Sequence, residues 1–159
     1  MNTTFKYGLA LGIVVEIWTA IVIAAGWHKD PLLLYLFFLV LPIQATILIL
    51  ALREISVSGG GYGRKVRTGL GVSLIGGVII LFGSVLLTAV VFPHYFDELR
   101  VAGEALLVKA GKKPEEVATM MKANESMYSP WSSGIQGFVG TMATGVLVSL
   151  IAAGWIRKR

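Results

Sequence analysis

The stretch GLGVSLIGGVIILFGSVLLTAVVF, residues 69–92, decides the fold class of this chain. It is predominantly apolar, and three further apolar runs of the same kind lie at about residues 7–27, 31–52 and 134–156. Each run holds about 21 to 24 residues, enough for an α-helix to cross a hydrocarbon core of about 30 Å. The sequence therefore predicts an all-α, integral membrane four-helix bundle.

The composition supports lipid as the solvent around these runs. Hydrophobic residues make up 55% and charged residues 14% of the 159 positions, and the mean hydropathy is +0.76. A soluble domain carries roughly 25% charged residues, so this chain has too few charges to cover a surface that faces water. Membrane lipid is therefore an expected partner.

The positions of the basic residues predict the orientation of the chain. The net charge is +5, but most cations flank helix ends that fall on one side after four crossings. These cations are Lys6, Arg53, Arg64, Lys65, Arg67, Arg157, Lys158 and Arg159. Because basic residues concentrate on the cytoplasmic side of membrane proteins, both termini and the glycine-bearing linker 53–68 are expected in the cytoplasm. No nucleic-acid partner is expected.

Residues 93–133 separate the third and fourth apolar runs and predict a helical insertion on the periplasmic side. Apolar residues recur at helical spacing through 95–110, and Gly111 is placed to end that helix. Pro114, followed by two acids, is a start signal for a second short helix. The chain is thus expected to form a single membrane domain, residues 1–159, with a small two-helix extramembrane cap.

Local signals also mark the ends of the apolar runs. Asp30 followed by Pro31 predicts the start of the second helix, because proline is well tolerated at the first helical position. Aromatic side chains at the run ends are typical of residues that lie at the level of the lipid headgroups. The expected interface anchors are Trp27, Tyr95, Trp131 and Trp155.

Four segments of the chain carry a family resemblance. They are GGYGRKVRTGLGVSLIGGVIILFGSVLL, FPHYFDEL, KKPEEVATMM and MYSPW, which lie at residues 60–87, 92–99, 112–121 and 127–131. Together they resemble a bacterial family of four-helix membrane proteins known as domain of unknown function 4199. The resemblance covers nearly the whole chain and implies a protein of the bacterial inner membrane. It implies no activity and no catalytic residue.

Glu16 is the sharpest candidate for a functional residue, because it lies in the middle of the first apolar run. Ionisable residues inside a membrane are costly and are functional candidates by default. Gln44 lies at a similar depth on the second run, and Ser84 and Thr144 fall near the middle of theirs. One hypothesis is a proton or ion relay based on Glu16. The other is a protonated Glu16 that hydrogen-bonds Gln44 and holds the first two helices together.

Small residues at four-residue spacing predict where the helices approach one another closely. In lipid, such residues permit backbone contact between helices. The candidate packing stripe is Gly137, Thr141, Gly145 and Ser149 on the fourth run, Gly69, Ser73 and Gly77 on the third, and Gly8 and Gly12 on the first. The stripe serves either the bundle itself or contact with another subunit.

The sequence offers no constellation for catalysis. It holds no cysteine and only two histidines, and no nucleophile–base pair is discernible. No metal, cofactor or enzymatic activity is therefore expected. The predicted role is an accessory or scaffold subunit, either a homo-oligomer or part of a larger membrane complex, that associates through small-residue faces and the cap. The alternative is a small transporter or a proton- or ion-conducting protein that uses Glu16.

Overall fold

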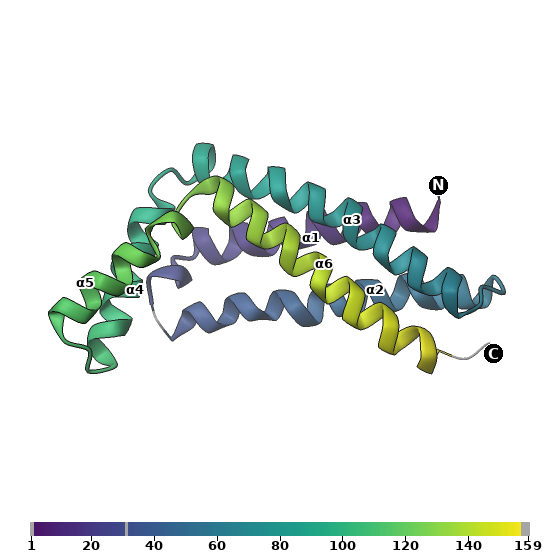
Figure 1. Ribbon diagram of the computed structural model, residues 1–159. Coiled ribbons are helices and arrows are strands. Elements are labelled where there is room, and N and C mark those ends of the chain that lie inside the picture. The colour runs from purple at the N-terminus through teal and green to yellow at the C-terminus, as the bar shows by residue number, and fades with distance from the viewer. Residues whose placement is uncertain (1, 31, 157–159) are drawn as a thin grey trace.

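The computed structural model describes residues 2–30 and 32–156, which form helices and short turns without any strand in those ranges. Four long helices lie side by side, and two shorter ones project from one end (Figure 1). The long helices are α1 (Thr3–Ala24), α2 (Val40–Val57), α3 (Tyr62–Leu86) and α6 (Pro130–Trp155). The short ones are α4 (Tyr95–Lys109) and α5 (Pro114–Ala123).

Four helical segments are long and apolar enough to cross a membrane, as the apolar runs predicted. They are Thr3–Ala24, Leu33–Val57, Tyr62–Val91 and Pro130–Trp155. Large apolar side chains cover their outer faces: Ile17, Phe82 and Leu147 are each more than half exposed. Apolar patches of this extent are rare on proteins that face water, so the outer surface is suited to lipid.

The end of α2 and the start of α3 differ from the prediction, because the expected linker 53–68 is mostly helical. α2 continues to Val57 and α3 begins at Tyr62, which leaves a turn at residues 58–61. Charged residues were taken to end the helices, but here they are held by contacts between helices. Glu54 on α2, for example, accepts a hydrogen bond from the Thr3 hydroxyl at 2.8 Å and pairs with Lys6 at 3.0 Å.

The N-terminal part of the second apolar segment, Leu33–Val57, also differs from a regular α-helix. Residues Leu33–Leu39 form a 3₁₀-helix, and α-helical geometry begins only at Val40. Pro42 explains the change, since it has no N–H to donate to the carbonyl of residue 38. The predicted start at Pro31 and the basic residues Arg157, Lys158 and Arg159 lie outside the described residues.

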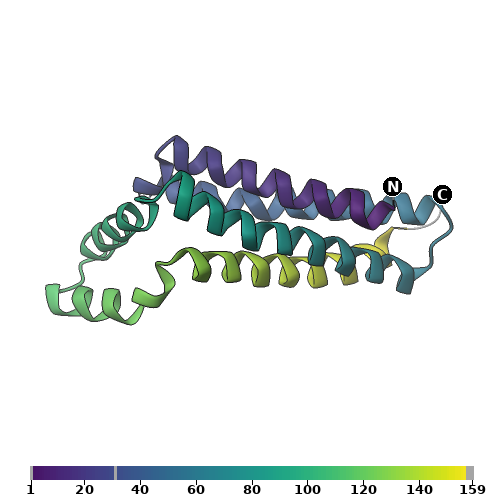
Figure 2. The same cartoon turned by 90° about the horizontal axis from the view of Figure 1, so that it is seen from above.

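α3 is the central helix of the bundle. It packs along α1 on one side and along α6 on the other (Figure 2). The apolar core runs between the long helices and includes Leu11, Val15, Leu48, Val72 and Ile80. The Thr3 end of α1, the turn at 58–61 and the Trp155 end of α6 gather at one end of the bundle, opposite α4 and α5 (Figure 1).

α4 and α5 form a helical hairpin at the other end, with the stop and start signals that the sequence predicted. Gly111 has a φ of 76°, which is typical of a glycine that ends a helix. Pro114 is the first residue of α5, and the carboxylate of Glu116 accepts a hydrogen bond from the Lys113 backbone at 3.1 Å. The role of this hairpin as an extramembrane cap stays a prediction.

Candidate functional site

Glu16 projects from α1 toward α3, the central helix, and is hydrogen-bonded to it. Its carboxylate accepts a hydrogen bond from the Ser84 hydroxyl at 2.9 Å. The neighbouring Gly83 makes room for it, because a Cβ at that position would lie 2.8 Å from the Glu16 carboxyl carbon. Two of the four candidate polar residues, Glu16 and Ser84, are thus brought together, and Gly83 is a site residue that the sequence analysis missed.

Gln44 pairs with α6 instead of with Glu16. Its side-chain N–H donates to the Thr141 hydroxyl at 3.1 Å, and both side chains are almost completely buried. The hydrogen bond proposed between Glu16 and Gln44 is therefore wrong. The proposal used only depth along the helices, which does not fix how far each helix is rotated. Thr144, which was singled out only for its depth in the fourth run, is in neither pair, and Thr141 is the α6 residue that bonds Gln44.

The packing stripe joins α3 to α6 through two reciprocal pairs of small residues. Gly145 faces Ser73, and Gly69 faces Ser149, so closely that a Cβ on either glycine would overlap the opposing serine hydroxyl. The same contact continues at Gly137, where a Cβ would lie 2.7 Å from Ile80 Cγ2. Gly77 likewise abuts the ring of Phe138. These glycines let the two backbones approach, as expected for helices packed in lipid.

The glycines of α1 make the corresponding contact on the other side of α3. A Cβ on Gly8 would lie 2.7 Å from Ile75 Cβ, and one on Gly12 would lie 2.6 Å from Ile79 Cβ. The hydroxyl of Thr141, the remaining stripe residue, accepts a hydrogen bond from Gln44. The structure therefore uses the whole candidate stripe for contacts within the chain.

Lys65 belongs to this packed face, although the sequence analysis placed it in a loop. It is buried, and its ammonium group donates to the backbone carbonyls of Ala153 at 3.4 Å and of Ile156. A cation at the carboxyl end of a helix stabilises the unpaired carbonyls and the helix dipole. The spacing of Lys65, Gly69 and Ser73 at intervals of four residues was the signal that could have revealed this role.

His28 and Glu98 connect the end of the bundle next to α4 and α5 to the projecting hairpin. His28 Nε2 lies 2.8 Å from one carboxylate oxygen of Glu98, and Lys29 Nζ lies 2.8 Å from the other. The His28 ring also contacts Tyr95, with 5.1 Å between ring centroids. Burial raises the pKa of the Tyr95 phenol. No group of three or more possible metal ligands forms within residues 2–30 and 32–156.

This connection is expected to weaken in acid. Hydrogen bonds and charge from Lys29 and then His28 lower the pKa of Glu98. The carboxylate therefore contributes its full stabilisation above the ordinary glutamate pKa of about 4.3, and loses it as the pH falls through the lowered value. We expect Glu98→Gln to unfold at a lower temperature than the wild type at about pH 6, with a smaller difference at about pH 3. Thermal unfolding in detergent at both pH values checks this, and a difference that persists unchanged in acid contradicts it.

The expected interface anchors divide into two groups. Trp131 and Trp155 stand at opposite ends of α6 and are 59% and 86% exposed, as an aromatic belt requires. Trp27 instead packs on Trp18, with 6.2 Å between ring centroids. Tyr95 is half-buried against His28, so its ring is not free to lie among headgroups.

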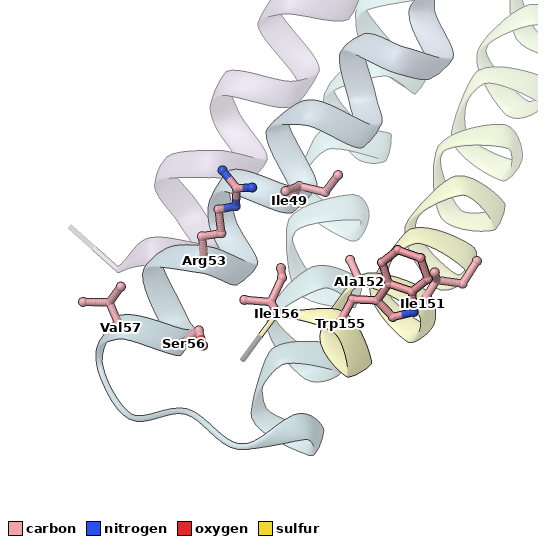
Figure 3. Close-up of a pocket in the computed structure, with 8 residues that line it drawn as sticks. All are labelled: Ile49, Arg53, Ser56, Val57, Ile151, Ala152, Trp155 and Ile156. Atoms are coloured by element: carbon pink, nitrogen blue, oxygen red, sulfur yellow. The ribbon is translucent and has the colours of Figure 1, made fainter. Parts of the chain in front are cut away.

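A groove opens between α2 and α6 at the end of the bundle that holds the turn at 58–61. It encloses about 710 Å³. In Figure 3, Ile49 points from α2 toward the α6 side, Ile156 lies between the two helices just after the end of α6, and Trp155 lies on α6. Arg53 is the one charged residue in this lining of the described chain. Such a groove is suited to a hydrocarbon chain with an anionic group near the arginine.

The comparison with known families agrees with this architecture. The sequence matches the model of a family described as a protein of unknown function (DUF4199) over residues 6–158. No curated protein and no solved structure matches the chain. The match covers nearly the whole sequence and confirms the resemblance seen in its glycine-rich and aromatic motifs. The chain therefore belongs to the DUF4199 family.

Proposed function

We propose that the protein is a non-catalytic, multi-pass protein of the bacterial inner membrane that acts as an accessory or scaffold subunit. Four apolar helices support the membrane location. The basic residues Lys6, Arg64 and Arg67 lie on the helix ends at the same end of the bundle as the turn at 58–61. This asymmetry supports cytoplasmic termini under the positive-inside rule.

The α4–α5 hairpin is the observation that carries the accessory role. The small-residue faces already pack against other helices of the same chain. The surface that we propose for a partner is therefore the hairpin. Val101 and Val108 lie on the same face of α4, about two helical turns apart, and they are 68% and 59% exposed. The ion pair of Glu98 with Lys29 and its hydrogen bond with His28 fix the hairpin to the bundle, so this apolar surface is presented in a set orientation. We propose that it binds another subunit of a membrane complex.

Affinity purification in a mild detergent tests this role. Val101→Asp combined with Val108→Asp is expected to remove the co-purifying subunit without lowering the unfolding temperature, because both side chains are exposed. Thr119→Asp, which places an acid at an exposed position of α5, is the matched control and is expected to retain the partner. A wild-type protein that purifies only as a lone monomer contradicts the accessory role. Recovery of a second copy alone assigns the surface to self-association.

Glu16 supports the alternative of a conducting protein, because its carboxyl group is held inside a span by Ser84. We expect it to be structural instead. Glu16→Gln keeps an oxygen that can accept from Ser84, so folding and complex formation are expected to be unchanged. Proteoliposomes are expected to show equal proton flux with either residue. A flux that the wild type supports and Glu16→Gln abolishes replaces the accessory role with transport.

Lipid is the second partner that we propose. The inner groove between α2 and α6 is lined by apolar side chains, with Arg53 beside them. An acyl chain of an anionic phospholipid fits this combination of an apolar channel and one cation.

A further inference from the structure

A second cavity lies in the outer half of the bundle, next to the α4–α5 hairpin. It encloses about 480 Å³, and all four spans and α4 contribute to its walls. Cavities of roughly 300–1,000 Å³ are typical of small-molecule sites. Much of the wall is apolar, including Val15, Phe37, Ile80 and Leu99.

Two buried polar atoms of the lining have no hydrogen-bond partner among the described residues. They are Gln44 Oε1 and His28 Nδ1, whose residues are 4% and 1% exposed. The Gln44 amide donates to Thr141 through its nitrogen, which leaves its oxygen as an acceptor. His28 Nε2 faces the Glu98 carboxylate and so donates to it, which leaves Nδ1 as the unpartnered atom of the ring. Unpaired buried polar atoms are costly, and the Gln44 oxygen, which can only accept, requires a donor from outside the described residues.

The other residues of the lining indicate what charge a donor molecule can carry and from where it can enter the cavity. Within the described chain, the lining contains no aspartate, glutamate, lysine or arginine. An ionic ligand would therefore lack a counter-charge in an apolar setting. Phe38, Leu41 and Gly140 belong both to this lining and to the exposed outer surface of the helices. A Cβ on Gly140 would meet no atom within 4 Å, so the cavity is open there, and a molecule dissolved in the bilayer can reach it.

We propose that this cavity binds a neutral, lipid-soluble alcohol or phenol. The apolar body lies against Phe37 and Ile80, and the hydroxyl group donates to Gln44 Oε1. The proposal goes beyond the accessory role and does not depend on it, since a bound lipid-soluble molecule is compatible with either a scaffold or a conducting protein.

Matched probes and variants separate the hydroxyl contact from the fit of the apolar body. The probes are radiolabelled farnesol, an isoprenoid alcohol, and farnesyl methyl ether, which has no proton to donate. Gln44→Leu removes the acceptor. Gly140→Phe places an aromatic ring at the open side of the cavity, and Gly154→Phe is its control, because a Cβ at either position meets nothing within 4 Å and Gly154 is outside the lining.

Saturable binding to the protein in lipid nanodiscs tests the proposal. We expect the wild type to bind farnesol more tightly than the ether, and Gln44→Leu to weaken farnesol roughly tenfold while changing the ether little. Retained ether binding shows that the variant is folded. Gly140→Phe is expected to weaken both probes, and Gly154→Phe neither. The absence of saturable farnesol binding to the wild type, equal affinity for both probes, or unchanged farnesol binding by Gln44→Leu each overturns the proposal.

Discussion

Gly145→Leu is expected to cause the largest loss of stability of any single substitution described here, about 3 kcal/mol or more. Any Cβ at position 145 would lie 2.5 Å from Ser73 Cβ and overlap the Ser73 hydroxyl. Leucine adds a branched side chain to that overlap. α3 cannot move away easily, because its opposite side is closed by Gly8 and Gly12, which pack on Ile75 and Ile79. The substitution therefore separates α3 from α6 along their tightest contact.

Thermal unfolding in detergent, followed by circular dichroism, measures this loss. Gly154→Leu is the control on the same helix, since nothing lies within 4 Å of a Cβ there, and it is expected to unfold like the wild type. Gly145→Ala is expected to be milder and to be rescued in part by Ser73→Gly, which removes the atoms that it meets. Equal stability of Gly145→Leu and wild type is incompatible with the α3–α6 contact described here.

Lys65→Met is expected to have the second largest effect, a loss of about 2 kcal/mol. Methionine fills much of the same buried space, so the change isolates the ammonium group. That group donates to the carbonyls of Ala153 and Ile156 at the end of α6. Hydrogen bonds from a charged donor contribute about 1.5–3 kcal/mol, and the cation also stabilises the helix terminus. Without it, the Ala153 carbonyl loses this donor at a buried position and the Ile156 carbonyl loses it at a partly buried one.

Hydrogen exchange at the carboxyl end of α6 checks this prediction together with the unfolding temperature. Faster exchange is expected at residues 150–156 in Lys65→Met, and a smaller change in Lys65→Arg, which keeps the charge. The exposed neighbour Arg64 provides the control, because a surface substitution is expected to change stability by less than about 0.5 kcal/mol. If Lys65→Met and Arg64→Met behave alike, Lys65 does not hold the α6 terminus.

The features that the sequence predicted correctly are those that depend on local patterns. Apolar runs located the four spans, because length and hydropathy alone determine whether a helix can cross lipid. Gly111 and Pro114 placed the boundary between α4 and α5 through backbone geometry. The four-residue spacing of small side chains identified faces that do pack closely, including the pairing of Gly145 with Ser73.

The features that were wrong or missed depend on how helices are rotated and paired. Depth along a span suggested Gln44 as the partner of Glu16, whereas rotation directs Gln44 to Thr141 and Glu16 to Ser84. The contact between His28 and Glu98 joins residues 70 positions apart, and no local pattern predicts it. Charge alone suggested a loop at Lys65, although a buried cation is stable when helix-end carbonyls surround it.

The opposite placement of the α4–α5 hairpin and the turn at 58–61 is the central claim, and single-cysteine labelling tests it most directly. The chain has no cysteine, so Ala118→Cys on α5 and Gly61→Cys in the turn each provide one thiol, at exposed positions. We predict that a membrane-impermeant maleimide labels Ala118→Cys on intact spheroplasts, and Gly61→Cys only after lysis. Labelling of both without lysis, or the reverse pattern, contradicts four membrane crossings in the proposed orientation.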